Sequence, residues 1–374
     1  MMNIDEINNK NKNVISSINQ DQKLPVLLEE ISLPQQLPPI VLLAFTRPDL
    51  LEQFLPAIAQ QTLRPSQILA FIDGPRNEKD QPLIAECMTL LTEFSQTIPV
   101  KIINQQHNLG CDAHAIYAIT EALSYYPAII YLEDDTIPNP YFYDRMCRLL
   151  EAYRHCPQVF SITAYANFPS EIREMITADF MVSRRVFALG LATWADRWQN
   201  LNLANHPQGY NPFGHFYQIP ATKQTKYTIT NQFYIETENK QDWVITLTLA
   251  ALHQGYIHIT PMVSLVHNIG FGHPEAKTYN TGTEPSWANA HSDRSACPNT
   301  LPSSLELIKP LADYFDGVEV ARHLESVQGL WLSPSGLWYL LGKYSDWHSR
   351  SAFLKLFFSR ILVLIRRWRS GKQI

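Results

Sequence analysis

Short apolar runs, each followed by a stretch of helical character, most constrain the folds open to this 374-residue chain. The runs are continuous rather than alternating in polarity, which is typical of strands buried on both faces of a parallel sheet. They occupy residues 40–45, 67–72, 100–103 and 128–132, and helical stretches are expected after the first run and over residues 81–94 and 113–125. This alternation predicts an α/β fold with a Rossmann-like, mostly parallel sheet flanked by helices.

The apolar run at residues 128–132 ends in three consecutive carboxylates, Glu133, Asp134 and Asp135. A carboxylate at the end of a buried strand is costly unless it is paired, hydrogen-bonded or coordinated. Hard oxygen ligands suit Mg²⁺ or Mn²⁺, which commonly take one or two carboxylates together with substrate phosphates. An acidic turn is the alternative, because Asp and Pro are common turn formers. The buried strand before the triplet favours a metal-binding function.

Further polar residues follow the other apolar runs, among them Arg47, Asp73 and residues 107–110. Ligands of parallel sheets bind at the carboxyl ends of the strands, so these residues are expected to share one site. The sequence has neither GxGxxG after the first run nor GxxxxGK[ST], which disfavours dinucleotide oxidoreductases and P-loop ATPases. Without such a loop, the charge of a diphosphate must be met by a metal and by side chains such as Arg47 and His114.

Net charge and cysteine content indicate which binding partners and which cellular compartment to expect. A formal net charge of -5 gives no electrostatic footprint for nucleic acid, so no nucleic-acid partner is expected. The five cysteines are odd in number and have no CxxC spacing, so they indicate neither a disulfide framework nor a zinc site. A reducing, cytoplasmic location fits this composition best.

Three regions are expected along the chain: a disordered tail over residues 1–37, a catalytic domain over 38–300, and a C-terminal extension over 301–374. The tail is rich in Asn, Gln, Lys and Ser and lacks the apolar core of a secretory signal. No stretch reaches the ~18 uninterrupted apolar residues of a membrane span. Residues 351–369 combine large apolar residues with five cations, as do helices that lie at the inner face of a membrane. A helix docked on its own domain or on a partner is the alternative.

Two polar regions have the composition of loops that build a binding site. Residues 200–240 are rich in Asn, Gln, Tyr, Phe and Pro, which suits loops around a pocket. Residues 272–299 have the composition of a mobile lid, although an ordinary surface loop would look the same.

Several short motifs together resemble a known family. In order along the chain they are residues 44–49, 72–74, 110–114, 131–135, 190–194 and 241–243. This series resembles the GT-A fold glycosyltransferases of the family-2-like group, in particular N-acetylglucosaminyltransferase I and its bacterial relatives. The likeness covers about residues 38–275, and the Glu-Asp-Asp motif after a strand is its most specific part.

The resemblance implies a metal-dependent, inverting hexosyl- or N-acetylhexosaminyltransferase. Such an enzyme moves a sugar from a nucleoside diphosphate sugar to a hydroxyl of a glycan or lipid-linked saccharide. The implied site residues are Arg47 at the diphosphate, Asp73 at the base, His114 at the nucleotide, Glu133 and Asp134 at the sugar and ribose, Asp135 and His267 at Mn²⁺ or Mg²⁺, and Asp242 as catalytic base.

Each of these roles has a plainer alternative. Inversion needs a carboxylate to remove the acceptor's proton, but an Asp at a helix start, as at Asp242, is commonly only a cap. Glu236 and Glu238 are the next candidates for the base. His267 and His114 could be hydrogen-bonded structural histidines.

Other functions would use the same fold. A nucleotidyltransferase that makes sugar nucleotides usually has a glycine-rich, lysine-bearing loop after the first strand, and residues 45–48 are not one. A catalytically silent carbohydrate-binding protein is the remaining alternative, against which the intact carboxylate triplet argues.

Overall fold

The computed structural model describes two compact units, which are treated separately below. The first comprises residues 1–204 and 256–307, and the second residues 205–255 and 308–374. Within them the structure describes residues 26–166, 168, 173–184, 186–201, 243–276, 282–284 and 288–307, with scattered residues between 337 and 358.

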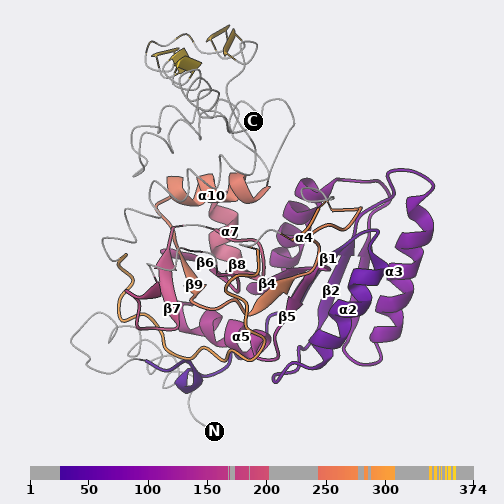
Figure 1. Cartoon of the computed structure of the whole chain (residues 1–374), viewed down its shortest axis with the longest axis horizontal. Coiled ribbons are helices and arrows are strands. Elements are labelled where there is room, and N and C mark those ends of the chain that lie inside the picture. The colour runs from indigo at the N-terminus through magenta and orange to yellow at the C-terminus, as the bar shows by residue number, and fades with distance from the viewer. Residues whose placement is uncertain are drawn as a thin grey trace. The chain divides into compact units, whose positions relative to one another are not determined.

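The first unit is built on an eight-stranded sheet in the order β3-β2-β1-β4-β8-β6-β9-β7 (Figure 1). Strands β1 to β4 are parallel, β8 runs antiparallel between β4 and β6, β9 is parallel to β6, and β7 is an antiparallel edge. The bounds are β1 Ile40–Ala44, β2 Ile68–Ile72, β3 Val100–Asn104, β4 Ala128–Glu133, β6 Val159–Thr163, β7 Phe180–Ser183, β8 Leu191–Trp194 and β9 Ile257–Pro261. The predicted α/β class and the mostly parallel sheet are confirmed.

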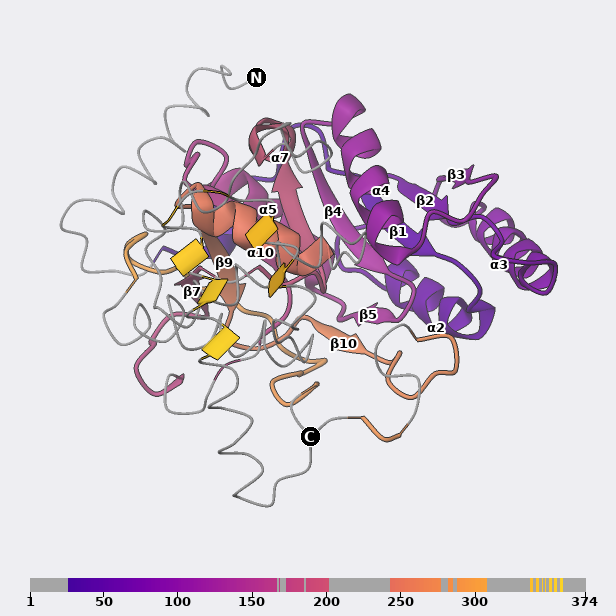
Figure 2. The same cartoon turned by 90° about the horizontal axis from the view of Figure 1, so that it is seen from above.

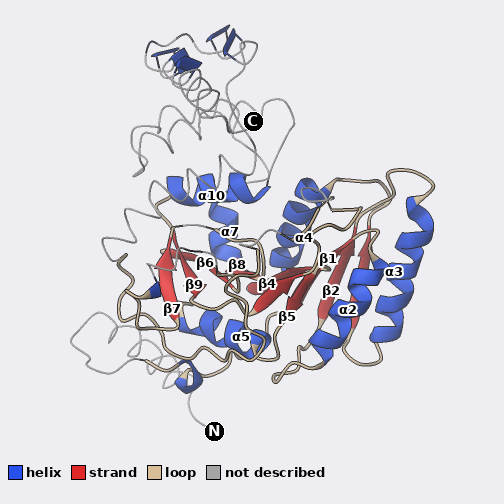
Figure 3. Cartoon of the chain, viewed as in Figure 1, coloured by secondary structure: helices blue, strands red, loops and turns tan. Residues whose placement is uncertain are grey.

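Helices flank this sheet (Figure 3). They are α2 Pro48–Ala59, α3 Asp80–Phe94, α4 Cys111–Tyr125, α5 Phe142–Ala152 and α7 Ala195–Leu201. The strand order turns back between β3 and β4, so right-handed crossovers place α4 on the face opposite α2 and α3 (Figure 2). The same reversal brings the carboxyl ends of β1 and β4 side by side, which is where ligands bind in such sheets.

The central strands explain why this region folds as it does. Every residue of β1, β2 and β6 is buried, so each strand needs cover on both faces and reads as a continuous apolar run. Helix α2 begins with Pro48 in its first turn, where the missing N–H costs nothing.

The expectation of a disordered tail through residue 37 is wrong for residues 26–37. Leu28 lies in a short 3-10 helix, η1 Leu28–Glu30, and is fully buried, and Ile31 is 3% exposed. Leu27 also forms a β-bridge with Thr300. This apolar stretch is too short to show a period in the sequence, yet it completes the core. Residues 1–25 lie outside the described part of the chain.

A second, two-stranded sheet joins two distant parts of the chain. Strand β5 Thr136–Pro138 follows the acidic triplet and pairs antiparallel with β10 Val266–Asn268. The register sets His267 opposite Ile137 and Asn268 opposite Thr136. The chain after β10 therefore starts directly beside Asp135.

In the second unit the structure describes helix α10 Trp243–His253 and isolated residues near the C-terminus. Two of those residues, Trp338 and Trp347, are 77% and 76% exposed. Among the described residues, no helix has the length and apolar character required to cross a bilayer. Most of the predicted C-terminal extension, including much of the basic segment 351–369, lies outside the described part.

Candidate functional site at the carboxyl ends of strands β1, β2 and β4

Arg47 and the acidic triplet meet where β1 and β4 end. One guanidinium nitrogen of Arg47, Nη1, donates to Oδ2 of Asp135 at 2.8 Å, and Nη2 donates to Oδ1 of Asp134. Asp134 is fully buried and Asp135 is 8% exposed. The structure thus brings together four residues that the sequence predicted for one site, with Arg47 as the cation that bridges two of the acids.

Charge at this strand end is only partly balanced within the described chain. Burial, reinforced by the charge of Asp135, raises the pKa of Glu133 to about 7, and the Tyr131 hydroxyl donates to Glu133 Oε1 at 2.9 Å. Burial raises the pKa of Asp134 to about 6, although Arg47 opposes the shift. Oδ2 of Asp134 is buried and has no hydrogen-bond partner in the described part. Three neighbouring carboxylates therefore have one guanidinium beside them, which pairs with two of them, and one buried oxygen of Asp134 has no partner in the described part.

The chain after β10 packs directly against Asp135. Oδ1 of Asp135 accepts from Thr136 Oγ1 at 3.2 Å and from Asn268 Nδ2 at 3.3 Å. The backbone N–H of Ile269 donates to the Asp135 carbonyl at 2.8 Å. A Cβ built on Gly270 would lie 2.2 Å from Asp135 Oδ2, so only glycine fits there without a shift. Asn268 and Gly270 are site residues that sequence reasoning missed, because only the three-residue pairing of β5 with β10 brings them here.

Residues 269–276, the crossing segment, continue over the ends of β1 and β2. His273 Nε2 lies 3.3 Å from Asp49 Oδ2 at the start of α2. Glu275 Oε2 accepts from Arg76 Nη2 at 2.5 Å and from Thr46 Oγ1 at 3.4 Å. The start of the region predicted as a lid therefore contacts the ends of two strands.

The carboxylate of Asp73, directly after β2, is hydrogen-bonded by nearby residues of the protein itself. It accepts hydrogen bonds from the backbone N–H of Gly74 at 2.8 Å, of Leu109 at 2.8 Å and of Gly110 at 3.0 Å, and from Asn108 Nδ2 at 3.0 Å. A carboxylate has about four lone-pair sites, so these four donors saturate it. Asp73 holds the turn before α4, and contact with a nucleotide base would require one of these bonds to break.

His114 lies in the first turns of α4 and is 1% exposed. Burial lowers the pKa of His114, while the charge of Asp73 opposes the shift, so the imidazole is neutral near pH 7. Its Nε2 is buried without a hydrogen-bond partner in the described part of the chain. No carbonyl satisfies this nitrogen in the described part of the chain, and because the nitrogen is buried, a polar ligand atom could bond it only if neighbouring residues move.

Whether the site can hold a divalent cation depends on the carboxylate oxygens of residues 133–135. Asp135 and Asp134 offer two carboxylates, one with an unpaired buried oxygen, which is the number that Mg²⁺ or Mn²⁺ commonly takes beside phosphate oxygens. Among the described residues no three His, Cys, Asp or Glu side chains form a ready-made metal cluster. The acids thus fit a cation that a phosphate ligand helps to hold.

The remaining predicted site residues lie elsewhere. From β10, the side chain that reaches Asp135 belongs to Asn268, whereas His267 lines a pocket beside β5 and β10. Its role as a metal ligand stays a prediction. Asp242, Glu236 and Glu238 lie outside the described residues. Trp194, the last residue of the motif 190–194, belongs to the core, because it is 5% exposed and the Arg197 guanidinium lies 3.5 Å from its ring centroid.

Comparisons with known proteins give distant likenesses only. No family model and no curated protein matches the chain. Among solved structures, a Pyrobaculum calidifontis mannosyltransferase in complex with GDP-Man and Mn²⁺ is 10% identical with a TM-score of 0.35, and the match covers 67% of this chain and 76% of that one.

A second likeness is to S. aureus TarS, which is 8% identical with a TM-score of 0.30 over 44% of this chain and 29% of that one. Residues 1–349 of TarS in complex with UDP-GlcNAc are 8% identical with a TM-score of 0.31, over 44% of this chain and 47% of that one. The chain thus spans under a third of the first TarS chain. At TM-scores of this size, function has to be inferred from the chain's own residues.

Proposed function

We propose that this protein is a glycosyltransferase that binds a nucleoside diphosphate sugar together with Mn²⁺ or Mg²⁺. The observation that carries the proposal is the buried end of β4, where Asp134 and Asp135 share Arg47 beside Glu133 and Asp134 keeps an oxygen without a partner in the described part of the chain. An uncompensated buried carboxylate is costly, so this arrangement is suited to a cation. A diphosphate brings the oxygen atoms that complete the coordination of such an ion.

Each described residue has a specific part in donor binding. Asp135 and Asp134 would hold the cation, which when bound supplies positive charge to the departing diphosphate. Arg47 presents a planar pair of donors that matches phosphate as well as carboxylate. Asp73 positions the turn before α4, and the neutral His114 behind that turn can hydrogen-bond the nucleotide.

Transfer to a hydroxyl also needs a base, for which we propose Asp242, with Glu236 and Glu238 next. The inverting outcome belongs to this proposal, because a carboxylate must take the acceptor's proton as the hydroxyl attacks. Asp242→Asn should bind donor normally and lose about 10²–10⁴-fold in turnover. Turnover within a few-fold of wild type would move the base to one of the two glutamates.

A thermal-shift screen of nucleotide sugars, with and without Mn²⁺, tests donor binding. A ligand that binds only the folded state raises the apparent melting temperature. We expect one nucleoside diphosphate sugar to stabilise the protein only when Mn²⁺ or Mg²⁺ is present, and its sugar would distinguish a hexosyl- from an N-acetylhexosaminyltransferase. If every donor fails in the presence of metal, the proposal is wrong.

We further propose a cytoplasmic enzyme held peripherally at the inner face of the membrane, acting on a glycan or lipid-linked saccharide. The support is the basic, apolar composition of residues 351–369. Each basic residue near an anionic surface contributes about 1 kcal/mol, weakened by salt. Deletion of residues 351–374 should release the protein from anionic liposomes and preserve donor binding. Full-length protein that does not sediment with such liposomes at low salt would contradict the peripheral location.

A further inference from the structure

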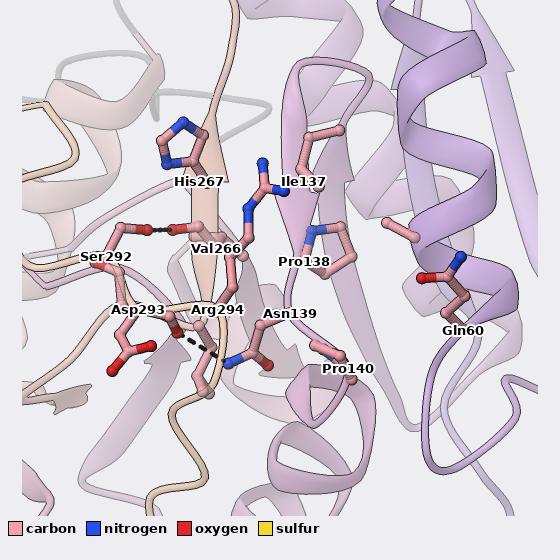
Figure 4. Close-up of a pocket in the computed structure, with 13 residues that line it drawn as sticks. Gln60, Ile137, Pro138, Asn139, Pro140, Val266, His267, Ser292, Asp293 and Arg294 are labelled. Carbon is pink, nitrogen blue, oxygen red and sulfur yellow. Dashed lines mark hydrogen bonds between the residues drawn. The ribbon is translucent and has the colours of Figure 1, made fainter.

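A pocket of about 180 Å³ lies beside the two-stranded sheet (Figure 4). Its walls come from the end of α2, from β5 and the residues after it, from β10, and from residues 292–294. Ligand sites for drug-sized molecules run to about 300–1,000 Å³. A space of this size suits one sugar ring or a similar small molecule rather than a nucleotide.

The pocket is separate from the strand-end site, but a ligand of a few sugar units could span the distance between them. Pro138 lines the pocket and is three residues from Asp135 along an extended strand, a span of roughly 10 Å. Gln60 lines it from the other end of α2, roughly 20 Å along the helix from Arg47. A ligand of a few sugar units could therefore occupy both places, whereas a single sugar could not.

The chemistry of the lining combines an apolar floor with a cation. Leu265 and Val266 are 0% and 2% exposed and form apolar wall together with the rings of Pro138 and Pro140. Arg294 lies at the rim and makes no hydrogen bond or ion pair within the described part of the chain. Figure 4 shows its side chain extended along β10 toward His267. Among the described residues, the cation therefore has no counterion at the pocket.

The nearby carboxylate does not neutralise Arg294. Asp293 Oδ1 accepts from the backbone N–H of Ser295 at 2.8 Å and from its hydroxyl at 2.7 Å. Its side chain is turned away from Arg294 in Figure 4.

Neutral polar groups complete the lining. Burial lowers the pKa of His267, Arg294 lowers it further, and Glu284 opposes both. The imidazole is thus a neutral hydrogen-bonding group, and the Gln60 amide is another at the rim. Arg294, the neutral donors and the apolar faces match a sugar that bears one acidic group, since the carboxylate of Asp293, which also belongs to the lining, is turned away from the cation.

We propose that this pocket binds a sugar-sized ligand that carries an oxyanion, either a carboxylate or a phosphate, with Arg294 as its counterion. In catalysis the ligand is a part of the acceptor remote from the reacting hydroxyl. That catalytic role rests on the proposed function, whereas binding of the ligand does not.

Calorimetric titration of the full chain, without donor or metal, tests the binding. Glucuronate and glucose 6-phosphate supply the two anions, and glucose is the neutral control. We expect at least one of the anionic sugars to bind about tenfold or more tightly than glucose, because a charge-assisted hydrogen bond is worth that much. The two sugars distinguish a carboxylate from a phosphate as the natural group.

Variants assign the preference to this pocket. Arg294→Gln should abolish the preference, Arg294→Lys should keep part of it, and Arg64→Gln, at an exposed arginine outside the pocket, should leave it unchanged. Glucose binding as tight as that of both anionic sugars would overturn the proposal. So would an unaltered preference in Arg294→Gln, or inorganic phosphate binding as tightly as glucose 6-phosphate.

Failure of this inference can be told apart from failure of the proposed function. Asp135→Ala should lose nucleotide binding and keep its preference for the anionic sugar, because Asp135 does not line the pocket. If the substitution removes both, the pocket is part of the donor site and the inference is wrong. If wild type binds anionic sugar but no nucleotide sugar, the inference holds and the donor proposal fails.

Discussion

The carboxylates at the ends of β2 and β4 both follow buried apolar strands, but they differ in how many hydrogen-bond donors the protein supplies to them. Asp73 accepts hydrogen bonds from four N–H groups of its own chain. Asp134 and Asp135 share one guanidinium, and a buried oxygen of Asp134 has no partner in the described part. A saturated carboxylate stabilises the fold, whereas an under-compensated one is ready for a ligand. Position at a strand end therefore does not separate the two roles, but the supply of donors does.

The strongest test of this contrast is Asp135→Ala. Removing one of the two proposed ligands should abolish metal-dependent nucleotide binding. The free energy of unfolding should change by less than about 1 kcal/mol, because the lost hydrogen bonds are offset by relief of the repulsion between Asp135 and its two acidic neighbours, and Arg47 keeps Asp134 as a partner. Titration with a nucleoside diphosphate and Mn²⁺, beside a urea melt, measures both. Glu52→Ala, at an exposed carboxylate of α2, serves as the control. Unchanged affinity for the nucleoside diphosphate in the presence of Mn²⁺ would show that the metal does not bind at the end of β4.

Asp73→Ala should have the reverse profile. It leaves the N–H groups of Gly74, Leu109 and Gly110 without this acceptor, while the Asn108 amide keeps only the Gly74 carbonyl, and we expect a loss of about 3 kcal/mol in the free energy of unfolding. Urea denaturation measures the loss, and Glu52→Ala is again the control. A loss below about 1 kcal/mol would mean that Asp73 does not hold the turn before α4 and that it is free to bind a base.

Gly270→Ala probes the packing of the crossing segment on Asp135. The backbone of Gly270 is not in the left-handed region, so the effect should be steric: the added Cβ meets Asp135 Oδ2 and costs about 1–3 kcal/mol. A thermal melt measures it. The matched control is the same substitution in an Asp135→Ala background, where Oδ2 and Cγ are gone and the Cβ of residue 135 remains at 3.0 Å, so the cost should fall. Equal costs in both backgrounds would contradict the contact.

The smallest expected effect is a pH dependence of metal binding. The pKa values of Glu133 and Asp134, about 7 and about 6, are raised, so the folded chain holds these protons to a higher pH than the unfolded chain does. The free energy of unfolding from this pair therefore falls as pH rises from about 4 to 7. Because a metal competes with those protons, Mn²⁺ affinity should rise about tenfold per pH unit below the pKa of Asp134 and level off above pH 8. A Mn²⁺-induced melting shift that is flat from pH 5.5 to 8 would contradict this.

The central part of the sheet was predictable because β1 and β2 are apolar and buried throughout and β4 is apolar up to Glu133. Residues 40–45 and 128–132 cannot be exposed, so the central strands and the strand-end site followed from the sequence. The three-residue strands β5 and β10 could not be predicted, because they are too short to show a period and pair across more than a hundred residues. Asn268 and Gly270 were missed for the same reason.

The state of each carboxylate was also beyond the sequence. Asp73 receives three of its donors from residues 108–110, which only the fold brings to the end of β2. Arg47 was predicted as a phosphate contact, but its pairing with Asp134 and Asp135 depends on β1 and β4 being neighbours. Sequence reasoning can gather polar groups at one edge of a sheet, but it cannot decide which of them are already satisfied.

The close approach of Gly270 to Asp135 imposes an order of events. With no free space on that side, the carboxylate of Asp135 cannot rotate toward residue 270 unless the backbone there moves first. The same backbone is tied through Asn268 and Ile269 to Asp135 and through Glu275 to Arg76 and Thr46. Rotation of the Asp135 carboxylate toward residue 270 therefore has to follow a displacement of residues 269–276, and the rate of that displacement sets an upper limit on the rate of the rotation.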